Sequence, residues 1–178
     1  AYSGTLDGGG HTLWLAIGEK YGVENSGYVY GDGALAGFGY SIAHNAAGLF
    51  GRLSGTVKNL KLQGALRGLA ANDRGYGAGL FGLLAGEVSG TVTLEQVEAD
   101  ADLTVDCKAG IATATAYIAC GLLARGNQAT LTLKGVRTAG TLTLNTVTPA
   151  GAHAGGVLGL MSGGTLDCED VTLAGALT

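Results

Sequence analysis

The heptad Thr-Val-Thr-Leu-Glu-Gln-Val at residues 91–97 decides the fold, because related heptads recur along the chain. Residues 56–62 read Thr-Val-Lys-Asn-Leu-Lys-Leu, residues 130–136 read Thr-Leu-Thr-Leu-Lys-Gly-Val, and residues 165–171 read Thr-Leu-Asp-Cys-Glu-Asp-Val. From one initial threonine to the next, the spacings are 35, 39 and 35 residues. Spacings of this size are typical of repeat architectures.

A glycine-containing segment, here called the anchor, precedes each heptad. The anchors are Gly-Leu-Phe-Gly at 48–51 and 79–82, Gly-Leu-Leu-Ala at 121–124 and Gly-Val-Leu-Gly at 156–159. A Leu-Thr pair follows the later heptads at 103–104, 142–143 and 177–178. Because these blocks keep one order, we align residue 48 with 79, 121 and 156, and residue 56 with 91, 130 and 165.

The period within the blocks is two residues, as in Thr-Leu-Thr-Leu at 130–133. Such alternation predicts strands with one buried face. Three short strands per repeat predict an all-β fold, a parallel β-helix (β-solenoid) of about five coils. We expect a single domain over 1–178, with a divergent first coil at residues 2–13 and an aromatic-rich insertion or cap at about 16–46.

The composition excludes several protein classes. The chain of 178 residues contains 34 glycines and one proline, with 47% hydrophobic and 13% charged residues, so neither collagen nor a disordered chain fits. The net charge is −4 and Lys/Arg are not clustered, which argues against nucleic acid as a partner. No apolar run approaches the roughly 18 residues that would indicate a membrane-spanning helix, so we expect no membrane insertion.

The opening residues, Ser-Gly-Thr-Leu-Asp-Gly-Gly-Gly-His-Thr-Leu at 3–13, resemble the start of many bacterial right-handed β-helices. The run from Ala47 to Gly51, followed by Gly-Thr-Val-Lys-Asn-Leu at 55–60, resembles the GLUG-type repeats of bacterial surface proteins and adhesins. It is also similar to the non-catalytic β-helix of IgA-peptidase-like proteins. The resemblance covers about residues 2–15 and 46–178, and departs from the pattern at Ala124-Arg125 and in the insertion.

This resemblance implies a right-handed parallel β-helix, an extracellular or cell-surface location and a structural or adhesive role. We therefore expect part of a longer repeat protein that displays loops to a glycan or to a protein of a host or neighbouring cell. Unpaired strand edges at both ends, especially after Thr178, would favour contact with adjacent repeats or with head-to-tail copies. We expect no catalytic residue, metal or cofactor. The alternatives are a carbohydrate-active enzyme on the same scaffold, such as a polysaccharide lyase or hydrolase, and an ice-binding solenoid.

Aromatic residues concentrate in the first coil and its insertion. They can stack on sugar rings or anchor an interface, although a cap over the end of the solenoid would need the same residues. A second candidate turn lies at 72–76. The candidate binding residues are Trp14, Tyr21, Tyr28, Tyr30, Tyr40, Asn72, Asp73, Arg74 and Tyr76.

Other polar groups have simpler explanations. Asp7 and His11 fit a tight turn followed by a strand, and His44 and His153 have no paired acid or nucleophile. The carboxylates fit a solvated outer face; they are Glu95, Glu98, Asp100, Asp102 and Asp106. The three cysteines, Cys107, Cys120 and Cys168, lack metal-ligand spacing; small buried residues or a Cys107–Cys120 bridge are the alternatives.

The Thr-x-Thr pairs raise the ice-binding alternative, since flat threonine ladders occur in some solenoid antifreeze proteins. In our alignment the third heptad position is occupied by Lys58, Thr93, Thr132 and Asp167. Two charges would then interrupt the ladder. We therefore attribute these threonines to strand propensity.

Overall fold

The computed structural model describes residues 1–17, 46–70, 78–107, 117–145 and 151–178. Within these residues the chain is all-β, without any helix, and its strands form one parallel sheet, which confirms the predicted class. The strands are β1 (Thr5–Asp7), β2 (Thr12–Ile17), β3 (Ala46–Ala47), β4 (Phe50–Leu53), β5 (Thr56–Ala70), β6 (Ala78–Cys107), β7 (Tyr117–Lys134), β8 (Arg137–Thr138), β9 (Thr141–Asn145), β10 (Ala152–Ala154), β11 (Leu158–Glu169), β12 (Thr172–Leu173) and β13 (Ala176–Leu177).

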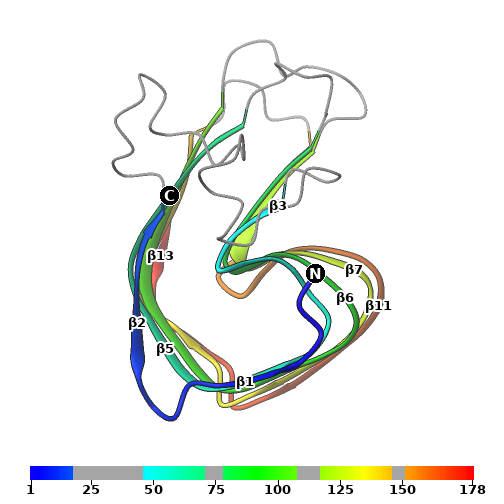
Figure 1. Ribbon diagram of the computed structural model, residues 1–178. Coiled ribbons are helices and arrows are strands. Elements are labelled where there is room, and N and C mark those ends of the chain that lie inside the picture. The colour runs from blue at the N-terminus through cyan, green and yellow to red at the C-terminus, as the bar shows by residue number, and fades with distance from the viewer. Residues whose placement is uncertain (18–45, 71–77, 108–116, 146–150) are drawn as a thin grey trace.

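The long strands bend, so each follows several sides of the molecule (Figure 1). β6 lies at the centre of the sheet: it pairs with β5 on one side and with β7, β8 and β9 on the other. β11, β12 and β13 form the last layer on β7, β8 and β9. Segments far apart in the sequence therefore lie directly over one another, and in Figure 1 their ribbons nearly coincide.

The heptad alignment is confirmed for the later repeats and wrong for the first one. Thr91 pairs with Thr130 and Thr130 with Thr165, as predicted. Thr56, however, pairs with Thr93 and not with Thr91. Leu53 pairs with Val88, and Thr56 pairs with Thr93. Four residues of β6 therefore lie between these two pairs, where the preceding layer has two. Because the error is an even number of residues, the buried and exposed faces of the strand keep their assignment.

The anchor alignment is also corrected. The register places Gly48 beside Gly82, Gly82 beside Gly121, and Gly121 beside Gly155, instead of aligning residue 48 with 79 and 156. A Cβ on Gly82 would collide with the backbone oxygen of Ala85, and one on Gly121 would collide with that of Gly155. Residues 79–83 contain Gly-Leu twice, and it is the second glycine that the register aligns with Gly48 and Gly121.

Corners of the sheet also stack. Asn59, Gln96, Gly135 and Asp170 all have positive φ, between 52° and 59°, and follow one another in the register. Asparagine and glycine tolerate this left-handed conformation better than most residues. Asn59, predicted to share a column with Leu94, thus belongs to the corner column, and Val57 pairs with Leu94 instead.

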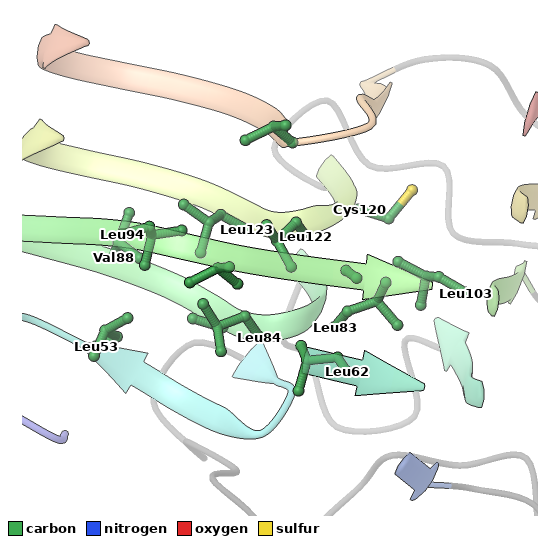
Figure 2. Close-up of a cluster of buried hydrophobic side chains, with 14 of the residues drawn as sticks. Leu53, Leu62, Leu83, Leu84, Val88, Leu94, Leu103, Cys120, Leu122 and Leu123 are labelled. Carbon is green, nitrogen blue, oxygen red and sulfur yellow. The ribbon is translucent and has the colours of Figure 1, made fainter. Parts of the chain in front are cut away.

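The core lies inside the curve of the sheet and is mostly aliphatic. Leu53, Leu62, Leu84 and Leu123 come from four different strands, β4, β5, β6 and β7, and none has exposed surface (Figure 2). Each inward position repeats from layer to layer, so its side chains form a column, and these columns together fill the interior. The core is therefore continuous along the stack.

Candidate functional site

The outer face of β2, β5 and β6 carries the strongest candidate for binding. The register pairs Trp14 with Gln63 and Gln63 with Asp100, so an indole, an amide and a carboxylate lie in one row across three strands. The row points outward because Leu13 and Leu15, on either side of Trp14, occupy inward positions paired with Leu62 and Gly64. Trp14 is 70% exposed. We call these three residues the Trp14 surface.

A charged row runs beside the Trp14 surface. Thr12 pairs with Lys61, Lys61 with Glu98, and Glu98 with Arg137, and the Lys61 Nζ lies 3.3 Å from a Glu98 carboxylate oxygen. An exposed aromatic ring flanked by amide and carboxylate groups can stack on a sugar ring and hydrogen-bond its hydroxyls. Sequence reasoning identified Trp14 but missed Gln63, because only the register shows that they are neighbours.

The remaining predicted binding residues lie outside the described residues. These are Tyr21, Tyr28, Tyr30, Tyr40, Asn72, Asp73, Arg74 and Tyr76. His44 and the side chain of Cys107 lie outside them as well.

The acidic run of β6 has structural partners. The Asp102 carboxylate accepts the backbone N–H of Thr141 at 2.8 Å, and the Asp106 carboxylate accepts the Asn145 side-chain amide at 2.8 Å. Glu98 and Glu95 of the same run do lie beside basic residues of adjacent strands, Lys61 and Arg137 for Glu98 and Lys58 and Lys134 for Glu95. No group of three potential ligands placed to hold a metal ion occurs in the part of the chain that the structure describes.

Asp7 stabilises the first turn. Its carboxylate accepts the backbone N–H of Gly9 at 3.0 Å and the side-chain amide of Asn59 at 3.0 Å, and Lys58 Nζ lies 3.3 Å away. The Asn59 bond, then the Gly9 bond and Lys58, lower the pKa of Asp7 despite an opposing desolvation effect. These contacts confirm the expected tight turn.

Two threonine columns cover the outer face of the heptad strands. One contains Thr91, Thr130 and Thr165. The other contains Thr5, Thr56, Thr93 and Thr132 and ends at Asp167. The predicted interruption by Lys58 is therefore wrong, because the two-residue correction puts Thr56 at that position.

An alternating row of charges, here called the charge ladder, runs beside the second threonine column. The register places opposite charges side by side in every layer, in the order Asp7, Lys58, Glu95, Lys134 and Glu169. Lys58 lies 3.3 Å from Asp7, and Lys134 lies 3.8 Å from Glu169. Stacking thus pairs opposite charges here.

A buried ion triad lies where the anchors end. Glu87 has no exposed side-chain surface, and its two carboxylate oxygens lie 2.5 Å from Arg52 Nη2 and 3.6 Å from Arg125 Nη1. Sequence reasoning missed this triad. With the anchors aligned correctly, Arg52, Glu87 and Arg125 occupy one position, and that charge pattern would have revealed it.

Cys120 and Cys168 differ in environment. Cys120 is buried, with its Sγ 3.6 Å from the backbone oxygen of His153, so packing as a small side chain is confirmed for it. Cys168 is exposed at the last layer, contrary to that expectation. His153 itself is half-buried and pairs with Ala119.

Comparison with known proteins identifies no relative: no family model, no curated protein and no solved structure matches the chain. No helix long and apolar enough to cross a membrane occurs among the described residues.

Proposed function

We propose that this chain is a right-handed parallel β-helix of about five coils, with a non-catalytic structural and adhesive role outside the cell or at its surface. The parallel register supports the architecture: successive partners of the Thr5 column are 51, 37, 39 and 35 residues apart along the chain. The longest spacing contains the insertion at about 16–46. The resemblance to GLUG-type repeats points in the same direction.

The observation that carries the adhesive role is the exposed Trp14. An indole with 70% of its surface in water gains little from folding, and an exposed aromatic ring of this kind is able to stack on a sugar. Gln63 and Asp100 place hydrogen-bonding groups beside it on a rigid sheet. A pyranose ring could stack on the indole with its hydroxyls directed at both polar side chains. We therefore propose glycan recognition at the Trp14 surface.

A glycan array tests this proposal. We expect binding that Trp14→Ala abolishes and Gln63→Ala weakens, whereas Thr165→Ala, an exposed change on another face, leaves it intact. Separate variants with Tyr28, Tyr30 or Tyr40 changed to Ala test the insertion. Absence of glycan binding, or binding unchanged by Trp14→Ala, would refute recognition at this surface.

Ice binding is a second candidate because the corrected register restores a threonine array. Strands in a sheet lie about 4.8 Å apart, so Thr56, Thr93 and Thr132 form a row with that repeat, next to the row of Thr91 and Thr130. Thermal hysteresis is the decisive measurement. Activity that disappears in Thr93→Lys but persists in Trp14→Ala would support it; no hysteresis in the unmodified protein would eliminate it.

A further inference from the structure

The outer face of the heptad strands is open to solvent along the side of the stack. It consists of the charge ladder and the second threonine column beside it, Thr5, Thr56, Thr93 and Thr132. We call it the heptad face. In Figure 1 it follows β1 along the bottom of the view, whereas β2, which carries Trp14, runs up the side. Because the heptad face is a side of the stack and not an end, further layers would lengthen it without covering it.

The ladder leaves its central carboxylate without an ion pair. Lys58 approaches Asp7 at 3.3 Å, and Lys134 approaches Glu169 at 3.8 Å. Both lysines thus pair with the outer carboxylates and not with Glu95, which lies between them in the register. Glu95 is exposed, and no residue that the structure describes forms an ion pair or a hydrogen bond with it. A carboxylate is therefore available at the centre of the face.

A second copy of this chain supplies the matching charge when the two heptad faces meet in antiparallel order. The two-fold axis then lies in the contact plane, across the stack and midway between the layers of Lys58 and Glu95, so that each column faces itself with its layers reversed. Lys58 of each copy faces Glu95 of the other. Lys134 of each copy likewise faces Asp7 of the other. Every ladder contact between the copies thus joins opposite charges.

Other positions of the axis fit less well. Moving the axis onto a layer would set like charges opposite each other, which is unfavourable. Moving it by one full layer toward the carboxyl-terminal layer restores opposite charges, but it brings Asp167, which ends the threonine column, onto Thr56 and covers a carboxylate without a cation.

In the favoured position, threonines face threonines. Thr56 of one copy lies opposite Thr93 of the other, and Thr132 lies opposite Thr5. A threonine hydroxyl both donates and accepts hydrogen bonds, so each facing pair can satisfy itself. The ladder and the threonine column therefore select the same arrangement.

We propose that the heptad face is a homodimer interface in which two copies pair face to face in antiparallel order. Four layers at ~4.8 Å and seven residues at ~3.3 Å give a contact of about 19 by 23 Å, or ~900 Å² for both copies together. This is at the low end for specific complexes, so the dimer is weak and depends on concentration. Trp14 lies on another face, so this pairing is independent of glycan recognition, but it covers the threonines that ice binding would need.

Sedimentation equilibrium of the full chain over a range of concentrations tests this interface, with circular dichroism confirming that each variant is folded. We expect a monomer–dimer equilibrium that shifts toward monomer as salt is added. Glu95→Gln should weaken the dimer about two- to thirtyfold, because it removes two symmetry-related exposed ion pairs. Thr93→Lys should abolish dimerisation, because it introduces a long charged side chain where threonines face each other. Glu98→Gln, the matched control beyond the corner of β6, should leave the equilibrium unchanged, as should Trp14→Ala.

Charge reversal tests the position of the axis. Glu95→Lys and Lys58→Glu each set like charges opposite one another in a homodimer, so either variant alone should dimerise less than the unmodified protein. A mixture of the two restores opposite charges at both contacts and should recover dimerisation as a heterodimer. With the axis one layer further on, position 95 would face Lys134, and the mixture would still oppose like charges.

The proposal is overturned by a protein that stays monomeric at every concentration, by a dimer insensitive to either Glu95→Gln or Thr93→Lys, or by charge-reversed variants that fold but do not recover on mixing. Growth beyond the dimer would show end-to-end stacking of copies and would also reject it. If the reversed variants do not fold, Glu95→Gln, which preserves the shape of the side chain, still decides.

Discussion

At the scale of single residues, Glu87 shows how much the surroundings of a charge matter. Its carboxylate is fully buried and lies between Arg52 and Arg125, whose side chains are 31% and 17% exposed. An isolated carboxylate would not tolerate this environment. The Glu87 carboxylate neutralises part of the charge of the two guanidinium groups beside it. It thereby links three layers of the sheet.

Glu87→Ala should lower the free energy of unfolding by about 3 kcal/mol, because it leaves two partly buried guanidinium groups adjacent to each other. Urea denaturation followed by circular dichroism measures the change. Glu95→Ala is the matched control: it also removes a carboxylate from β6, but at an exposed position, and should cost about 1 kcal/mol or less. Equal costs for the two variants would contradict a special role for the triad.

Asp7 should titrate below its ordinary pKa of 3.8, because hydrogen bonds from Asn59 and Gly9 favour its ionised form. A depressed pKa in the folded state stabilises the fold above the unfolded-state pKa. That contribution is lost as the pH falls through the lower, folded-state value. Carboxyl ¹³C shifts followed against pH give the midpoint.

The Asn59 contact has the largest effect on this pKa, so Asn59→Ala should raise the midpoint more than Lys58→Gln does. The reverse order would show that charge, and not the hydrogen bond, controls Asp7.

At the scale of elements, the register of β5 on β6 is the main correction to the sequence alignment. Thr56-Val57 matches Thr91-Val92 in identity, yet the structure pairs it with Thr93-Leu94. Both registers bury the same face, so the two-residue period does not distinguish them. The extra residues between Val88 and Thr93, where β6 departs from its neighbours, decide the pairing.

A double-mutant cycle can test this register. In the structure Lys58 lies beside Glu95, whereas the sequence alignment would put it beside Thr93. Charge removal by Lys58→Gln and Glu95→Gln should show a coupling energy of about 0.2–1 kcal/mol at low salt, reduced at high salt. The pair Lys58→Gln and Thr93→Val is the control and should be additive. Coupling in the control pair alone would restore the original alignment.

At the scale of the whole molecule, stacking explains both the composition and the candidate surfaces. Close approach between layers excludes larger residues at Gly48 and Gly121, where an added Cβ would collide with the backbone of Gly82 and of Gly155; at Gly82 and Gly155 the collision is with Ala85 and Leu158 of the same segment. Stacking also turns distant residues into rows: Trp14 with Gln63 and Asp100 on one face, and threonines beside the charge ladder on another.

The amino-acid sequence by itself determined the all-β class, the parallel repeats and the alternation of buried and exposed residues, because these follow from a two-residue period repeated at fixed spacing. Only the tertiary structure decided which glycines stack, that Thr56 meets Thr93, and that Glu87 lies between two arginines. Those outcomes depend on the number of residues between strands and on contacts between backbones distant in sequence. A two-residue sequence pattern specifies neither of these, so it fits alignments that differ by two residues equally well. Only the three-dimensional structure distinguishes such alignments.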